Sequence, residues 1–148
     1  MNIIFLDIDG VMNHLNHFVR SQKHILQEFC PIAEENLKRI IRECDAKIVV
    51  SSTWRKISSS VDGTIAEWLF SHYGLENYVI GVTPRLENEI RGKEIQKYIE
   101  NATHKISNFV ILDDDSDMGE LIGHLVQTDY KYGLTDEKCE EAIKILNI

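Results

Sequence analysis

The chain has 148 residues, a formal net charge of −8 and 43% hydrophobic residues, which suits a single soluble domain with one core. The sequence contains no run of about 18 apolar residues, the length needed to cross a membrane. The negative charge disfavours tight, non-specific binding of nucleic acid through a broad basic face. The three cysteines lack CxxC spacing, which disfavours a disulfide framework or a zinc site and favours reduced, buried thiols.

The first part of the chain predicts a strand, a helix and a second strand. Residues 3–6 are an apolar run that suits a strand buried on both faces. This start lacks the basic residues and the cleavage site of a signal peptide, so we expect a cytoplasmic protein. Residues 31–44 have helical spacing, and residues 46–52 predict a buried strand. Residues 13–30 are the least regular, and we expect a loop or a small flap there.

The rest of the chain continues the alternation of helices and strands. Residues 64–74 predict an amphipathic helix, in which Trp68, Phe70 and Tyr73 are interpreted as core residues. The later elements are a strand at 78–84, a helix at 92–101, a strand at 108–115, a helix at 118–125, an edge strand at 126–130 and a helix at 134–148 with Thr135 as N-cap. This order predicts one α/β domain over residues 1–148, three-layered and Rossmann-like, with a mainly parallel central sheet.

Reactive side chains follow three of the predicted strands. Asp7 and Asp9 follow the first, Ser51 and its neighbours follow the second, and Asp113 to Asp115 follow a later one. Because ligands bind beyond the carboxyl ends of parallel strands, we expect these side chains to meet at one edge of the sheet. The carboxylates would repel one another unless a cation intervened, and oxygen ligands without histidine or cysteine favour Mg²⁺.

The pair Asp7 and Asp9 suggests a specific chemistry. Gly10 lets the chain turn, so that both carboxylates can face one pocket. One carboxylate could attack phosphorus to form an aspartyl-phosphate while the other carries the proton of the leaving group. The metal would screen the negative nucleophile from the negative phosphate. The residues alone therefore predict a magnesium site, and hydrolysis of phosphomonoesters by a magnesium-dependent phosphatase is one chemistry that such a site could carry.

Four segments resemble the ordered motifs of the haloacid dehalogenase-like (HAD) phosphatase superfamily. They are FLDIDGV, IVVSSTWR, a basic residue before a helix, and ILDDDSD, and together they span residues 3–117. The resemblance implies that Asp7 is the nucleophile and a Mg²⁺ ligand. It also implies that Asp9 is the general acid and base, with its backbone carbonyl on the metal.

The same resemblance assigns the phosphate-binding and remaining metal-binding residues. Ser51, with Ser52 beside it, would bind the phosphoryl oxygens. In the acidic motif, Asp114 is favoured as the direct metal ligand, with Asp113 as its close neighbour or outer-shell partner. Asp117 would hold a metal-bound water or a loop.

The basic motif is a choice between two cations at the start of a predicted helix. Arg91 is favoured over Lys93, because Arg91 directly precedes Gly92 as the family's basic residue often does. Arginine in place of the commoner lysine departs from the family pattern but would still neutralise the phosphoryl oxygens.

Each candidate also has a plainer interpretation. Serines can cap a helix, acidic residues can form a solvated turn, and Arg91 and Lys93 can be ordinary charges at a helix start. Loop histidines are more often solvated than catalytic. Trp54 and Arg55 could contact a substrate base or sugar, although Trp54 is as readily a core residue. The histidines concerned are His14, His17 and His24.

The spacing between the four segments leaves no room for a large cap domain, so we expect an open site that suits a large substrate. The segments SSTWR and RGKEI also resemble phosphatase domains associated with RNA-repair proteins, which implies polynucleotide ends as a substrate. A small-nucleotide or metabolite phosphatase, a phosphotransferase and a non-catalytic metal-binding interaction module of the same fold stay open. No membrane and no obligate protein partner is indicated.

Overall fold

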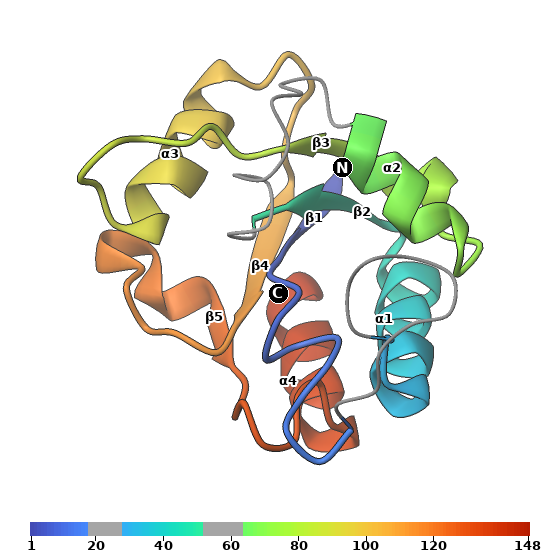
Figure 1. The fold of residues 1–148 in the computed structure, drawn as a ribbon. Coiled ribbons are helices and arrows are strands. Elements are labelled where there is room, and N and C mark those ends of the chain that lie inside the picture. The colour runs from blue at the N-terminus through green and yellow to red at the C-terminus, as the bar shows by residue number, and fades with distance from the viewer. Residues whose placement is uncertain (18–27, 52–63) are drawn as a thin grey trace.

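A five-stranded, all-parallel sheet forms the centre of the molecule, with the strand order β3-β2-β1-β4-β5 (Figure 1). The structure is a computed structural model and describes residues 1–17, 28–51 and 64–148. The strands are β1 (Asn2–Leu6), β2 (Ala46–Val50), β3 (Val79–Val82), β4 (Asn108–Asp113) and β5 (Leu125–Gln127). The predicted α/β fold with a parallel sheet is confirmed.

The first strand, β1, lies in the middle of the sheet. Its residues Ile3 to Leu6 are fully buried, as expected for an apolar strand covered on both faces. In the parallel register, Leu6 is the partner of Val50 on one side and of Leu112 on the other. The residues that follow these three therefore emerge together at one edge of the sheet.

Helices cover both faces of the sheet and complete three layers (Figure 1). The helices are α1 (Pro31–Cys44), α2 (Thr64–Ser71), α3 (Arg91–Asn101) and α4 (Asp136–Leu146), with 3-10 helices η2 (Glu76–Tyr78) and η3 (Gly119–His124). Side chains of β1 alternate between the two faces. Ile4 and Leu6 pack with residues of α1, α2 and α4, whereas Ile3 and Phe5 pack with residues of α3.

Several predicted elements differ from the observed ones in their bounds or in their type. The second strand ends at Val50 and the fourth at Asp113, because the chain leaves the sheet at the polar residues of the site. The predicted helix at 118–125 is the 3-10 helix η3. Among the helices, the one predicted at 64–74 ends at Ser71, the one at 92–101 begins at Arg91, and the one at 134–148 is Asp136–Leu146. Among the strands, the one predicted at 78–84 is Val79–Val82, and the one at 126–130 is Leu125–Gln127.

The prediction that Trp68 is a core residue was wrong, because this side chain is 47% exposed. Leu69, Phe70 and Tyr73 share the buried side of this segment, and helical geometry turns the preceding residue away from them. The interpretation of Phe70 and Tyr73 as core residues is confirmed.

Other predictions about the scaffold hold. Thr135 accepts a hydrogen bond from the backbone N–H of Lys138 and so caps α4. All three cysteines are buried and free of disulfides. No helix within the described ranges has the length and apolar character needed to span a membrane. No separate cap domain is formed by the described residues, and most of the segment 13–30 predicted to be a flap lies outside them.

Candidate active site

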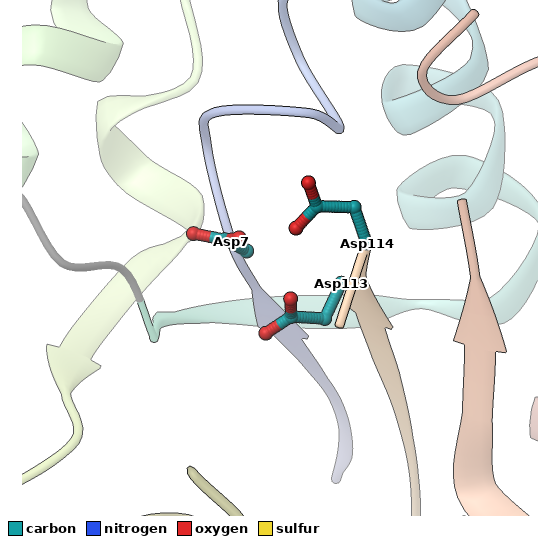
Figure 2. A group of neighbouring side chains, drawn as sticks. All are labelled: Asp7, Asp113 and Asp114. Atoms are coloured by element: carbon teal, nitrogen blue, oxygen red, sulfur yellow. The ribbon is translucent and has the colours of Figure 1, made fainter. Parts of the chain in front are cut away.

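Three carboxylates lie together beyond the ends of β1 and β4 (Figure 2). Asp7 directly follows β1, Asp113 is the last residue of β4, and Asp114 comes next in the chain. One oxygen from each carboxylate lies within 4.8 Å of the other two. The backbone N–H of Ile8 donates to Asp7 Oδ1 at 2.9 Å, and that of Asp115 donates to Asp113 Oδ1 at 3.0 Å. These bonds orient two of the three side chains.

This cluster is electrostatically costly when the carboxylates stand alone. Asp7 is 7% exposed and Asp113 is 2% exposed. Burial raises the pKa of both side chains, and the charge of Asp7 raises the pKa of Asp113 further. Burial also raises the pKa of Asp114. Such a cluster is expected to attract a cation, because a cation favours the charged form of all three groups.

Arg91, the first residue of α3, supplies positive charge to the cluster. Its Nη1 lies 3.4 Å from Asp113 Oδ2 and 3.9 Å from Asp7 Oδ1, and it donates to the backbone carbonyl of Ser51. Its charge opposes the effect of burial on the pKa of both aspartates. Of the two cations considered from the sequence, the structure therefore brings Arg91 to the carboxylates, whereas Lys93 is exposed.

Two acidic residues hold Arg91 in place: Glu94, which was not predicted as a site residue, and Asp117, which was expected to hold a metal-bound water or a loop. Glu94 is 5% exposed, and its Oε1 lies 3.6 Å from Arg91 Nε while its Oε2 accepts a hydrogen bond from Leu86 N at 2.9 Å. Asp117 Oδ2 accepts from the backbone N–H of Arg91 at 3.2 Å. The backbone carbonyl of Asp117 also accepts from Gly92 at 3.0 Å. Through these two hydrogen bonds Asp117 holds the start of α3.

Ser51 lies at the same edge, directly after β2. It is 1% exposed, and its N–H donates to the carbonyl of Leu6 at 2.8 Å, which extends the pairing of β1 with β2. Its Oγ lies 3.5 Å from both Arg91 Nη1 and Thr83 Oγ1. Thr83, which follows β3 and is 2% exposed, was missed from the sequence although it is also a hydroxyl residue at a strand end.

Asp9 differs from the other acidic residues because it is exposed. Its Oδ1 accepts a hydrogen bond from Asn13 Nδ2 at 3.0 Å, and Asn13 Oδ1 accepts from the N–H of Gly10 at 3.3 Å. Gly10 has φ +84°, and a Cβ built there would lie 2.3 Å from Asp114 Oδ2. Glycine is therefore required both for the turn and for the close approach of Asp114.

A further residue that was missed joins the site to the sheet edge beyond β5. The N–H of Thr128 donates to the carbonyl of Asp113 at 2.9 Å. Its Oγ1 donates to the carbonyl of Gly10 at 2.8 Å. A single buried threonine thus connects the loops that carry Asp9 and Asp114.

Some predicted residues lie elsewhere. Ser52, Trp54, Arg55 and His24 are outside the described residues. His14 and His17, expected to be solvated, are half-buried, because the loop that carries them packs against residues 130–133. Burial lowers the pKa of His14.

The side chains at this edge fit Mg²⁺. Asp7, Asp113 and Asp114 provide three oxygen ligands from rigid positions at strand ends, and carboxylate oxygens are the ligands that Mg²⁺ prefers. Both Asp113 and Asp114 belong to this group, so the structure brings together the two alternatives considered for the acidic motif.

Comparison with known proteins assigns the family. The model of the HAD domain in Swiss Army Knife RNA repair proteins matches residues 3–139. The chain belongs to this HAD domain family. Membership in this HAD family indicates a hydrolase of the phosphatase type. No curated protein matches the sequence significantly.

Proposed function

We propose that this HAD domain is a magnesium-dependent phosphatase that hydrolyses phosphomonoesters through an aspartyl-phosphate on Asp7 and acts on the ends of polynucleotides. The observation that carries the proposal is the convergence of Asp7 with Asp113, Asp114 and Arg91 at one edge of the sheet. A buried nucleophile beside two further carboxylates and a guanidinium supports phosphoryl transfer better than a structural role, because an unused cluster of this kind would only cost stability.

The proposed nucleophile, Asp7, is fixed in its orientation and position. The N–H of Ile8 fixes the rotation of the Asp7 carboxylate, and the paired strands β2 and β4 hold the backbone on both sides. A bound Mg²⁺ on Asp7, Asp113 and Asp114 would neutralise the carboxylates and the phosphoryl oxygens. Arg91 and Ser51 bind the phosphoryl group from the side of β2, where the hydroxyl and the guanidinium lie close together.

Two balanced steps complete hydrolysis. In the first, an oxygen of Asp7 forms a bond to phosphorus, the bond from phosphorus to the ester oxygen breaks, and Asp9 gives its proton to that oxygen. In the second, the Asp9 carboxylate takes a proton from water, the water oxygen attacks phosphorus, and inorganic phosphate leaves Asp7. Asp9 suits this role because it is exposed, so that both a leaving group and water can reach it.

Two observations support a large substrate. The described residues form no cap domain over the site, so a polymer end has access. The family model comes from HAD domains in RNA repair proteins. A phosphorylated oligonucleotide is therefore the first substrate to test, with mononucleotides as the alternative.

The test is hydrolysis of a generic aryl phosphate by wild type and by Asp7→Asn, with Mg²⁺ and with EDTA. We expect Asp7→Asn to lower kcat by roughly 10³-fold or more, and EDTA to abolish turnover. Asp45→Asn is the matched control, because Asp45 has a left-handed φ of 49° that asparagine also tolerates, and it lies at the end of α1. Wild-type activity in Asp7→Asn would overturn the covalent mechanism, and unchanged activity in EDTA would overturn the metal assignment.

Substrate class is tested separately with 3′- and 5′-phosphorylated oligonucleotides against the corresponding mononucleotides. A higher kcat/KM for one class of oligonucleotide is expected. Exclusive hydrolysis of mononucleotides would contradict the polynucleotide assignment, and a wild-type protein that hydrolyses no phosphomonoester would favour a non-catalytic module of the same fold.

A further inference from the structure

A tight turn next to the site carries two exposed tyrosines. The turn follows β5, and the carbonyl of Asp129 accepts hydrogen bonds from Tyr132 N at 3.0 Å and Gly133 N at 2.8 Å. The Asp129 carboxylate accepts from Lys131 N at 2.8 Å. Gly133 has φ +68°, and a Cβ there would lie 2.7 Å from the carbonyl of Val11. The turn is therefore braced internally and packed against the loop that follows Asp9.

Tyr130 and Tyr132 differ from the other three tyrosines of the chain. Tyr73 stacks on Phe29 with ring centroids 4.0 Å apart, Tyr98 meets Phe5 edge-on, and Lys47 lies over the Tyr78 ring. Tyr130 is 56% exposed and Tyr132 is 57% exposed. Within the described ranges, neither ring packs on another aromatic ring.

Hydrogen bonds place this turn beside the edge of the sheet that carries Asp7, Asp113 and Asp114. Thr128, which bonds both Asp113 and Gly10, is two residues from Tyr130, a backbone span of at most ~7 Å. From the other side, Leu15 N donates to the carbonyl of Tyr130 at 2.9 Å. Figure 1 shows the loop after β1 and the segment after β5 side by side beyond the carboxyl ends of the strands. The turn that carries the two rings is therefore joined by hydrogen bonds to the loop after β1, and the adjoining Thr128 is bonded to the end of β4.

We propose that Tyr130 and Tyr132, with Lys131 between them, form a stacking platform for the bases next to the phosphorylated end of a single-stranded nucleic acid. The inference rests on the proposed function and adds to it the surface that recognises the polymer. Aromatic rings bind bases of any sequence by stacking, and a lysine between them can pair with the phosphate backbone. Lys131 is exposed, whereas the Asp129 carboxylate is turned to the backbone of its own turn.

This platform also reconciles the net charge of −8 with a nucleic-acid substrate. Stacking on neutral rings requires no broad basic face. Recognition would then be confined to a few nucleotides beside the site, which suits an enzyme that acts on ends.

The test measures equilibrium binding of a fluorescent, unphosphorylated single-stranded pentanucleotide by anisotropy, which requires no turnover. We expect the double variant Tyr130→Ala/Tyr132→Ala to weaken binding about tenfold or more. The double variant Tyr130→Phe/Tyr132→Phe should stay within about twofold of wild type, because phenylalanine retains the stacking face. Tyr78→Ala is the matched control, because Tyr78 is also exposed but precedes β3, at the opposite edge of the sheet.

The kinetic counterpart is the ratio of kcat/KM for a phosphorylated pentanucleotide to kcat/KM for the mononucleotide. This ratio should fall in the alanine variant and persist in the phenylalanine variant. Unchanged pentanucleotide binding in the alanine variant would overturn the platform, as would an equal loss in Tyr78→Ala. Weakened binding of a phosphopeptide without weakened binding of the pentanucleotide would assign the surface to protein instead. A wild type without phosphatase activity that still shows the tyrosine-dependent binding would refute the proposed function and leave the platform standing.

Discussion

Arg91 shows why the basic residue of this site is an arginine. Its guanidinium reaches the carbonyl of Ser51, the carboxylate of Asp113 and the carboxylate of Glu94 at the same time. A planar group with five N–H donors can satisfy these partners in fixed directions, whereas an ammonium group is a single point charge. Glu94 thereby acts as a positioning residue, because it holds the side of the guanidinium that faces away from the site.

Glu94→Gln should therefore impair catalysis through Arg91. The glutamine can still accept the hydrogen bond from Leu86 N, but its amide then turns N–H donors toward the guanidinium. We expect kcat/KM for a small phosphomonoester to fall about tenfold, with a rise in KM, because the phosphoryl group loses an oriented cation. Glu100→Gln, an exposed position on the same helix, is the control. Full activity in Glu94→Gln alongside impaired activity in Arg91→Ala would argue against this coupling.

The proposed acid role of Asp9 predicts that the loss of activity in Asp9→Asn depends on the leaving group. In Asp9→Asn, we expect kcat for an alkyl phosphate to fall by roughly 10²-fold or more, because the poor leaving group needs a proton. Hydrolysis of a p-nitrophenyl ester should fall much less, since that leaving group departs as an anion. Comparison of the two substrates in steady-state assays checks this expectation, and equal losses on both would assign Asp9 a different role.

At the scale of single residues, the sequence predicted the acidic residues at strand ends but missed Thr83 and Thr128, which also follow strands, and Glu94, which only tertiary contacts define. Asp7 and Asp113 follow apolar runs, so their place at the sheet edge could be inferred. Glu94 looks like any acidic residue in the first turn of a helix, and only packing makes it buried. Thr128 likewise gains its role from Gly10, which lies far away in the sequence.

Among the elements, the packing of α3 against the segment after β4 determines the position of Arg91. A Cβ at Gly92 would lie 2.1 Å from the backbone carbonyl of Met118, so the start of α3 rests directly on the segment after the acidic cluster. Backbone atoms cannot move aside as a flexible side chain can. The glycine after Arg91 is thus explained by close packing, and its φ is not in the left-handed region.

Gly92→Ala should destabilise the protein and displace Arg91. We expect a loss of about 1–3 kcal/mol in the free energy of unfolding, together with reduced activity, because the helix start must shift to make room. Denaturant unfolding and kinetics measure the two effects. Gly123→Ala is a matched control, because a Cβ there meets no atom within 4 Å. Similar unfolding free energies for the two variants would show that α3 can shift at little cost.

The elements themselves were largely predictable, but the ends of most of them were not. Strong periodicity revealed α1 with its bounds, including Pro31 in the first turn. The 3-10 helix η3 contains Gly119 and Gly123, and its short apolar pattern could not be distinguished from an α-helix by periodicity. Strand ends were overestimated because no glycine or proline directly follows Val50 or Asp113 in the sequence to mark the end.

At the scale of the whole molecule, the carboxylate cluster links stability to pH and to metal. Burial raises the pKa of Asp7, Asp113 and Asp114 above the ordinary value of 3.8. The folded, metal-free protein then binds more protons than the unfolded chain, so its free energy of unfolding falls as the pH rises above about 4. Mg²⁺, which we propose binds these groups in their deprotonated form, would act in the opposite direction.

We therefore expect Mg²⁺ to raise the Tm more at about pH 8 than at about pH 5. At about 100-fold its Kd, the increase should be roughly 5–10 °C. Thermal unfolding in EDTA and in Mg²⁺ measures it. Asp7→Asn should reduce both the Mg²⁺ effect and the fall of stability with pH in EDTA, because it removes one of the buried charges. The same Mg²⁺ effect in Asp7→Asn and wild type would place the ion elsewhere.

The architecture as a whole followed from the alternation of strands and helices, but the order of the strands did not. Each β-strand carries a similar apolar run, so periodicity does not reveal which strands are neighbours. The central position of β1 became clear only from its parallel register with both β2 and β4.

That central position has a consequence for how the protein is made. One neighbour of β1 is β2, but the other, β4, begins only at Asn108. At a translation rate of about 5–20 residues per second, β1 waits roughly 5–20 s before its second partner is synthesised. A nascent chain released before that point would present Asp7 on a half-paired apolar strand, without the acidic residues that complete the site. Assembly of the candidate active site is thus expected to be a late event in biosynthesis, and the unpaired edge of β1 is expected to be exposed until then.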